Sequence, residues 1–150
     1  MITVGPIVPT SCVTTRLAAL HARAFERSAR PWTANEIKTL ASASGATLIA
    51  ERSRDPLGFA LFRQVLDEAE LLTICVEPCQ RNKGVGRALM RYSKVFLRAN
   101  RCAVIFLEVN EANRAALSVY NRAGFLPVGY RKEYYGAGNS GCALSLACHL

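Results

Sequence analysis

The stretch that decides the fold is Arg81-Asn82-Lys83-Gly84-Val85-Gly86-Arg87. An apolar, strand-like run ends just before it at Ile74-Cys75-Val76, and apolar residues at helical spacing follow it over 85–99. The first turn of a helix has backbone N–H groups without partners and a partial positive charge. Glycines allow a ligand to approach that backbone closely, and the Arg and Lys side chains add positive charge. The stretch therefore predicts a cradle for a ligand that carries phosphates.

Two better-known phosphate motifs do not fit this stretch. No Gly-Lys-Ser/Thr follows, as a Walker loop requires, and the dinucleotide fingerprint needs a third glycine and an acidic residue about 20 positions later. A glycine-containing turn with a solvated basic face is the alternative interpretation.

Outward from this stretch, the patterns alternate between helix and strand. The helix at 85–99 links a strand at 69–76 to a buried strand at 103–109, which predicts a right-handed crossover between parallel strands. Before it, short polar breaks separate the strands and predict an antiparallel meander. Thr33 and Glu36 form a capping box at the start of an early helix. The remaining elements are predicted at 13–25 and 113–122 for helices, and at 47–51, 57–65, 125–130 and 142–148 for strands.

These elements predict an α/β (α+β) fold in one domain over 1–150. Its mixed central sheet is expected to be antiparallel in the N-terminal half, parallel at the centre and flanked by helices. The chain length suits one domain, and we find no repeat or linker.

Composition sets further limits on function. The chain is 51% hydrophobic with a formal net charge of +8, and it contains no apolar run long enough to span a membrane. Residues 1–6 lack the charged start and apolar run of a secretion signal, so we expect none. The six cysteines form no C-x-x-C pair, so we expect reduced thiols, no metal site and a cytoplasmic protein.

Two motifs in order resemble the acetyl-CoA-binding signatures of the GNAT superfamily of N-acetyltransferases. The first runs from Val76-Glu77-Pro78 through the glycine-containing stretch to Leu89, and the second, Asn113 to Phe125, fits N-x-x-A-x-x-x-Y-x-x-x-G-F. The resemblance implies a single GNAT domain in which the central parallel strands splay apart, with acetyl-CoA as cosubstrate.

The resemblance also implies roles for individual residues. Tyr120 would be the general acid that protonates the departing thiolate, and Asn113 would contact the pantetheine arm besides capping its helix. The backbone of one strand would bind pantetheine, and the glycine-containing turn would bind the phosphates. The cofactor-binding residues expected on this basis are Ile74, Cys75, Val76, Arg81, Asn82, Lys83, Gly84, Val85, Gly86, Arg87 and Asn113.

Glu108 is the candidate general base. Transfer of an acyl group from a thioester needs a neutral amine, and an α-amine with a pKa near ~7.7–8.0 must lose a proton first. Glu108 interrupts an apolar strand near its C-terminal end, where ligands of open α/β sheets bind. We expect it to act directly or through water; a solvent-facing carboxylate at a strand end is the alternative.

The acceptor is predicted from a narrower resemblance. Residues 66–78, Leu107-Glu108-Val109 and 131–135 are similar to bacterial enzymes that acetylate the N-terminal alanine of a small-subunit ribosomal protein. We therefore expect a protein N-terminus as acceptor, contacted by Tyr134 and Tyr135, with no need for a membrane or direct nucleic-acid contact. The C-terminal Ser140-Gly141-Cys142 departs from this pattern.

Two other classes of function stay open. One is an acetyltransferase for a small amine or a lysine side chain. The other is a non-catalytic module whose basic surface binds RNA or the ribosome.

Overall fold

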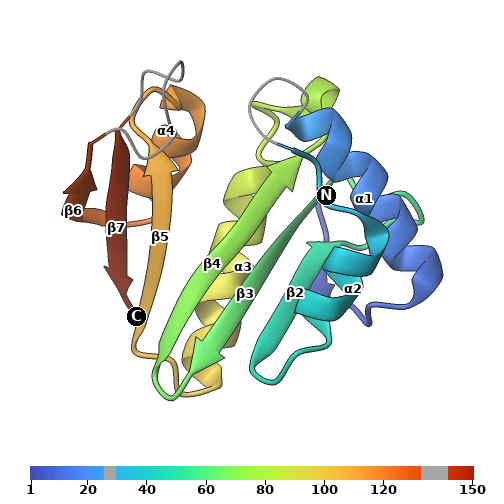
Figure 1. Cartoon of the computed structure of the whole chain (residues 1–150), viewed down its shortest axis with the longest axis horizontal. Coiled ribbons are helices and arrows are strands. Elements are labelled where there is room, and N and C mark those ends of the chain that lie inside the picture. Colours follow the sequence, from blue (N-terminus) through green and yellow to red (C-terminus); the bar gives the residue numbers. More distant parts are fainter. Residues whose placement is uncertain (26–29, 133–141) are drawn as a thin grey trace.

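A computed structural model describes residues 1–25, 30–132 and 142–150. A seven-stranded sheet in the order β1-β2-β3-β4-β5-β7-β6 forms the centre of the molecule (Figure 1). The elements are β1 (Val4–Pro6), α1 (Ser11–Ala24), α2 (Ala34–Ala41), β2 (Ala46–Glu51), β3 (Gly58–Val65), β4 (Glu68–Val76), a 3-10 turn (Pro78–Gln80), α3 (Val85–Ala99), β5 (Val104–Asn110), α4 (Arg114–Arg122), β6 (Leu126–Arg131) and β7 (Ala143–His149).

Local capping sets the starts of the first two helices. The Thr10 hydroxyl accepts a hydrogen bond from the Val13 N–H, so α1 begins two residues earlier than the apolar spacing predicts. The capping box of α2 is confirmed, because Thr33 and Glu36 exchange hydrogen bonds in both directions. Side-chain oxygens therefore hold both helix starts.

The antiparallel meander of β2, β3 and β4 is confirmed. A register shift pairs Leu61 with Thr73 but Phe62 with Leu71, so Leu72 is an extra residue on β4. Such a bulge turns the following side chains relative to the sheet. The short edge strand β1 beside β2 was not predicted.

The parallel strands at the centre separate early, as the predicted splayed sheet requires. β4 and β5 pair only at Glu68↔Val104, Ala69↔Ile105 and Glu70↔Phe106. Beyond these pairs β4 continues to Val76 and β5 to Asn110, and Figure 1 shows the two strands diverging toward their tips. The facing backbone edges are left open where the two strands end.

The C-terminal part of the sheet differs in order from the chain. β7 lies between β5 and β6 and is antiparallel to both, an arrangement that the sequence did not predict. All six residues of β6 are exposed, and a bulge interrupts its pairing between Pro127 and Gly129.

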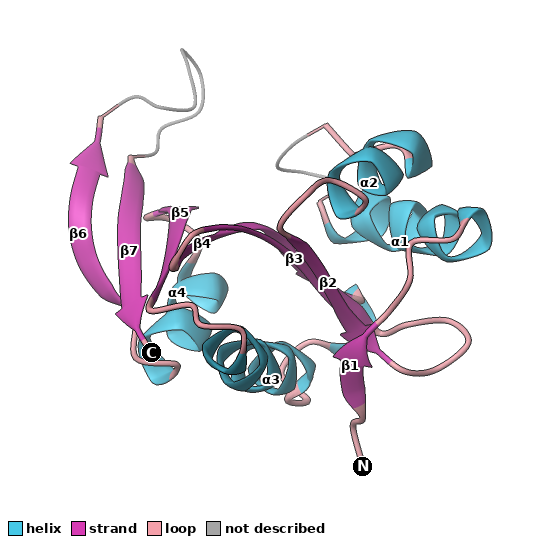
Figure 2. Cartoon of the chain, turned by 90° about the horizontal axis from the view of Figure 1, so that it is seen from below, coloured by secondary structure: helices cyan, strands magenta, loops and turns pink. Residues whose placement is uncertain are grey.

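Two layers of helices cover different parts of the sheet (Figure 2). Leu17, Leu20 and Ile37 of α1 and α2 pack against β2, β3 and β4. On the opposite face, α3 and α4 pack on the sheet through a core that includes Met90, Leu97, Tyr120 and Phe125. Figure 2 shows no described helix over β5, β7 and β6 on the α1 side. That face of the C-terminal strands, here called the open face, borders the gap between β4 and β5.

Candidate functional site

The start of α3 has the geometry of an anion cradle. Asn82 and Gly84 both have left-handed backbone conformations, with φ of 62° and 91°, and they form a tight turn into the helix. α1, α2 and α4 each begin with a side-chain cap, whereas α3 begins at Gly84 without one and has no acidic residue in its first turn. The N–H groups of this turn are therefore available to a negatively charged ligand.

Gly86 lies where three elements meet. A Cβ built on Gly86 would lie 3.6 Å from Val76 Cγ2 of β4 and 3.8 Å from Val119 Cγ2 of α4. The absence of a side chain opens the helix backbone toward the end of β4, where β4 has left β5. The start of α3 and the open strand edge thus lie side by side.

The predicted side chains of this turn divide into two groups. Lys83 and Arg87 are exposed beside the cradle. The Arg81 guanidinium instead donates a hydrogen bond to the Ala24 carbonyl at the end of α1, at 2.8 Å. Val85 is 2% exposed and belongs to the core, so only its backbone can meet a ligand.

A contact that sequence reasoning missed fixes the loop before the cradle. The Arg23 guanidinium donates to both carboxylate oxygens of Glu77, and its shortest bond is 2.7 Å. Together with the Arg81 bond, this pair anchors the loop between β4 and α3 on the end of α1. No local pattern reveals a pair 54 residues apart in the chain.

The three predicted residues of β4 lie at its unpaired end, on alternating faces. Ile74 and Val76 are partly buried and pack toward α3. Cys75 is 4% exposed and faces the core beneath α1. Burial raises the pKa of the Cys75 thiol well above its usual range, which disfavours the thiolate that a covalent acetyl-cysteine route needs. This supports a backbone role for all three residues.

Tyr120 is buried on the inner side of α4. Its ring packs against Phe125, with the two ring centroids 5.7 Å apart. Burial raises the pKa of Tyr120, so the phenol is protonated at neutral pH. Among the described residues, no hydrogen bond involves its hydroxyl, yet no fully buried side-chain oxygen lacks a partner. The side chain is 6% exposed, and its hydroxyl is not used by any described residue, which leaves it available to a ligand.

Asn113 caps α4, as the sequence predicts. Its side-chain oxygen accepts a hydrogen bond from the Ala116 N–H at 3.1 Å. The cap brings Asn113 to the same end of the sheet as the tip of β5, which ends at Asn110. A contact between its amide group and pantetheine stays a prediction.

Glu108 lies on the open face of β5. Its neighbours Leu107 and Val109 belong to the core that contains Tyr120, and successive side chains of a strand alternate, so Glu108 points to the other face. The side chain is 34% exposed, and one carboxylate oxygen lies 3.6 Å from the Arg131 guanidinium of β6. The two candidate proton-transfer groups thus lie on opposite sides of β5.

Tyr134 and Tyr135, the predicted acceptor contacts, lie outside the described residues. Four cysteines in apolar, strand-like runs are expected to be buried. Cys75, Cys102 and Cys148 are buried, whereas Cys142 is only partly buried. Within residues 1–25, 30–132 and 142–150, no three His, Cys, Asp or Glu side chains are placed to hold a metal ion. No helix in those ranges is long and apolar enough to cross a membrane.

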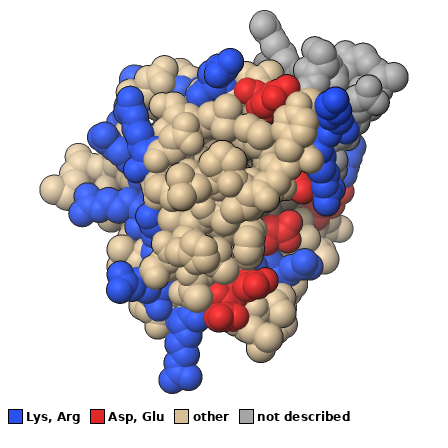
Figure 3. All heavy atoms as spheres, turned by 90° about the vertical axis from the view of Figure 1, so that its left-hand side faces the viewer, with Lys and Arg blue, Asp and Glu red and all other residues tan. Residues whose placement is uncertain are grey.

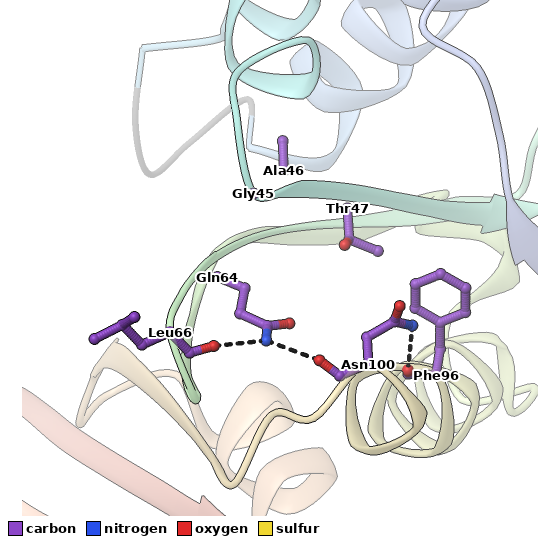
Figure 4. A pocket seen from close by; sticks show the side chains of 7 residues that line it. All are labelled: Gly45, Ala46, Thr47, Gln64, Leu66, Phe96 and Asn100. Atoms are coloured by element: carbon purple, nitrogen blue, oxygen red, sulfur yellow. Dashed lines mark hydrogen bonds between the residues drawn. The ribbon is translucent and has the colours of Figure 1, made fainter.

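A hollow of about 390 Å³ lies at the opposite end of the sheet (Figure 4). The Gln64 amide donates to the carbonyls of Leu66 and Asn100, and the Asn100 amide donates to the Phe96 carbonyl. These bonds hold the hairpin between β3 and β4 against the end of α3, so the polar groups around the hollow serve the structure of the fold. The chemistry of the candidate site lies elsewhere.

The comparisons agree with this geometry. The model of the acetyltransferase (GNAT) family matches residues 15–125. The chain is 34% identical over 128 residues to the [ribosomal protein bS18]-alanine N-acetyltransferase of Escherichia coli K12, covering 83% of this chain and 84% of the relative. It is 39% identical over 92 residues to the N-alpha-acetyltransferase RimI of Mycobacterium tuberculosis, covering 61% and 54%.

A solved structure extends the likeness to almost the whole chain. The crystal structure of the ribosomal-protein-S18-alanine N-acetyltransferase from Escherichia coli superposes with a TM-score of 0.86 and 26% identity, covering 99% of this chain and 94% of that one. Uncapped helix start, open strand edge and family match all point the same way: the chain belongs to the acetyltransferase (GNAT) family and is an acetyl-CoA-dependent N-acetyltransferase.

Proposed function

We propose that this enzyme acetylates the N-terminal α-amine of a protein, and that the acceptor is the N-terminal alanine of the small-subunit ribosomal protein bS18. The observation that carries the proposal is the 34% identity to the enzyme of that activity, over 83% of this chain and 84% of the relative. Such an acceptor is made in the cytoplasm, which is also the compartment that the sequence predicts.

The placement of the two proton-transfer candidates suits a reaction across the gap between β4 and β5. Glu108 faces the open side of the sheet, where an amine can enter, while Tyr120 lies on the α3–α4 side. In the proposed reaction Glu108, directly or through water, takes a proton from the amine. The neutral amine nitrogen then bonds to the acetyl carbon, the carbon–sulfur bond breaks, and the Tyr120 hydroxyl gives its proton to the departing sulfur. The second proton that leaves the nitrogen as the amide forms restores the Tyr120 hydroxyl, and the first leaves Glu108 for solvent.

The open backbone edges complete the proposed site. Ile74, Cys75 and Val76 end a strand that has lost its neighbour, so their backbone groups can bind pantetheine in the manner of a strand. A backbone N–H of this segment is our candidate donor to the thioester oxygen, whose negative charge grows in the transition state. The first turn of α3, with Lys83 and Arg87, would hold the phosphates.

The chemistry of the acceptor agrees with a single exposed base. An α-amine has a pKa near ~7.7–8.0, against about 10.4 for lysine, so a far larger fraction is neutral near pH 7. A carboxylate beside the gap needs to assist only modestly with such an amine. A lysine acceptor would ask for stronger assistance.

The decisive experiment compares three acceptors in the presence of acetyl-CoA. The first is a peptide with the N-terminal sequence of bS18, the second is the same peptide with a blocked N-terminus and a lysine retained, and the third is a polyamine. We expect acetylation of the first alone, located by mass spectrometry at the α-amine. Equal acetylation of the blocked peptide, or preference for the polyamine, would replace the proposal with a lysine or small-amine acetyltransferase.

A further inference from the structure

Positive charge is concentrated on the helices behind the sheet. α3 and α4 carry Arg87, Arg91, Lys94, Arg98, Arg114 and Arg122 and not one acidic residue. Figure 3 shows only basic side chains along the left-hand flank, whereas the right-hand half of the visible face carries acidic and basic side chains together. The exposed arginines Arg87, Arg91, Arg98, Arg101, Arg114 and Arg122 are here called the basic face.

No carboxylate in residues 1–25, 30–132 or 142–150 forms an ion pair with the basic face. Every ion pair among the described residues involves arginines outside it, namely Arg16, Arg23, Arg30, Arg63 and Arg131. In the described part of the chain, Arg52, Arg54 and Arg81 also lack a carboxylate partner, but only α3 and α4 bring several such arginines together on neighbouring helices without an acidic residue. A partner with many negative charges fits this surface best.

Helix stability explains only part of the pattern. Arg98 and Arg122 lie in the last turns of α3 and α4, where a cation stabilises the helix dipole. Arg87 and Arg114 lie in first turns, where the dipole disfavours a cation. The helix dipole therefore does not account for Arg87 and Arg114.

Acetyl-CoA alone does not account for the extent of the basic face. Arg87 is next to the phosphate cradle, but Arg98 follows eleven residues later along α3, about 16 Å away at a rise of about 1.5 Å per residue. Lys94 joins the two helices by donating a hydrogen bond to the Ala123 carbonyl of α4, at 2.5 Å. The face therefore runs beyond the cradle along α3 and continues onto α4.

We propose that the basic face binds the phosphate backbone of double-helical RNA. The basic face extends about 16 Å along α3 and has no carboxylate partner among the described residues, which suits a ligand that carries many phosphates. A membrane-bound helix would also present a broad apolar side, and the only large apolar side chain strongly exposed on α3 or α4 is Val95. The described part of these helices offers no exposed aromatic ring for stacking on single-stranded bases. The choice of RNA over DNA rests on the proposed ribosomal acceptor. The argument from charge, that the basic face binds a polyanion, is independent of the proposed function.

The test uses the full chain and a fluorescent RNA duplex of about 20 base pairs, titrated from about 50 mM to about 200 mM salt. The variant Arg98→Gln/Arg101→Asn/Arg122→Gln removes charge far from the cradle. A control, Lys38→Gln/Arg54→Gln/Arg63→Gln, removes the same charge from other elements. We expect the first variant to bind at least about 10-fold more weakly and to reduce the salt slope by about 2–3, because three phosphate contacts are lost.

Three results would overturn the proposal: no binding by the natural chain at low salt, equal weakening in both variants, or much tighter binding of a DNA duplex of the same length. CoA affinity should be unchanged in the first variant, which shows that its site is intact. The peptide assay stands apart from this measurement. A natural chain that acetylates the bS18 peptide but does not bind the RNA duplex rejects the basic face alone, and a natural chain that binds the duplex but does not acetylate the peptide rejects the acceptor alone.

Discussion

Replacing Gly86 with alanine should raise stability and lower cofactor affinity at the same time. The new methyl would meet Val76 and Val119 at 3.6 and 3.8 Å, which is ordinary van der Waals contact, so the fold accepts it. Gly86 lies in the first turn of α3, and alanine is favoured over glycine in a helix by roughly 0.5–1 kcal/mol. For a domain of this size the melting temperature without ligand should rise by about 1–4 °C.

The same methyl would occupy the space through which a phosphate reaches the helix N–H groups. Loss of one hydrogen bond to a charged group costs about 1.5–3 kcal/mol. CoA should therefore bind roughly 10- to 100-fold more weakly. The effects on stability and on binding thus have opposite signs, which general damage to the fold cannot produce.

Calorimetric titration with CoA and thermal unfolding with and without CoA measure both quantities. Gly84→Ala is the matched control: φ is 91° there, so a side chain should destabilise the protein by about 1–2 kcal/mol although its Cβ has space. A Gly86→Ala protein of higher melting temperature that binds CoA as tightly as the natural chain would refute the cradle.

Three further outcomes follow from the structure. Glu108→Gln and Tyr120→Phe should each lower kcat by about 10²–10⁴-fold with little change in CoA affinity, since each removes a proton-transfer group. Full activity of both variants in steady-state kinetics would contradict the roles proposed for these residues. Burial, and to a smaller extent the charge of Arg30, lower the pKa of His21 from 6.5, so the unfolded chain binds a proton more readily than the folded one. The contribution of His21 to stability should be complete above pH 6.5 and be lost as the pH falls below it. Urea unfolding at several pH values should therefore show a free energy of unfolding that depends less on pH in His21→Gln. Asn113→Ala should lower the free energy of unfolding by about 0.5–2 kcal/mol because it removes the helix cap, whereas Asn113→Asp keeps the cap. If Asn113 contacts CoA, both variants should bind CoA more weakly, and urea unfolding then separates this effect from the loss of the cap.

Local signals predicted the parts of the site that depend on neighbouring residues. The start of α3 followed from Gly84 and from the apolar spacing after it, and Asn113 and Tyr120 followed from positions within one motif. Contacts between distant segments were not predictable in this way. Arg81 reaches Ala24 across 57 residues, which no periodicity encodes.

The order of the strands in the sheet was the other feature that the sequence did not predict. The sequence predicts β6 and β7 as strands, but insertion of β7 beside β5 depends on how both pack over α4. The side of the sheet that Glu108 faces was not predictable either. Alternation along β5 predicts that Glu108 and Val109 face opposite ways, but only the fold shows which side the helices cover.

The exposed edge strand β6 has a consequence for the behaviour of the protein in solution. Leu126, Val128 and Tyr130 leave an apolar row on a strand whose outer hydrogen-bonding edge faces no described element, a combination that promotes aggregation through strand pairing. Pro127 lacks an N–H, and the bulge before Gly129 breaks the regular ladder, so a second chain finds no straight edge to extend. Replacing Pro127 with a residue that has a backbone N–H should therefore lower the solubility of the protein while its activity is unchanged.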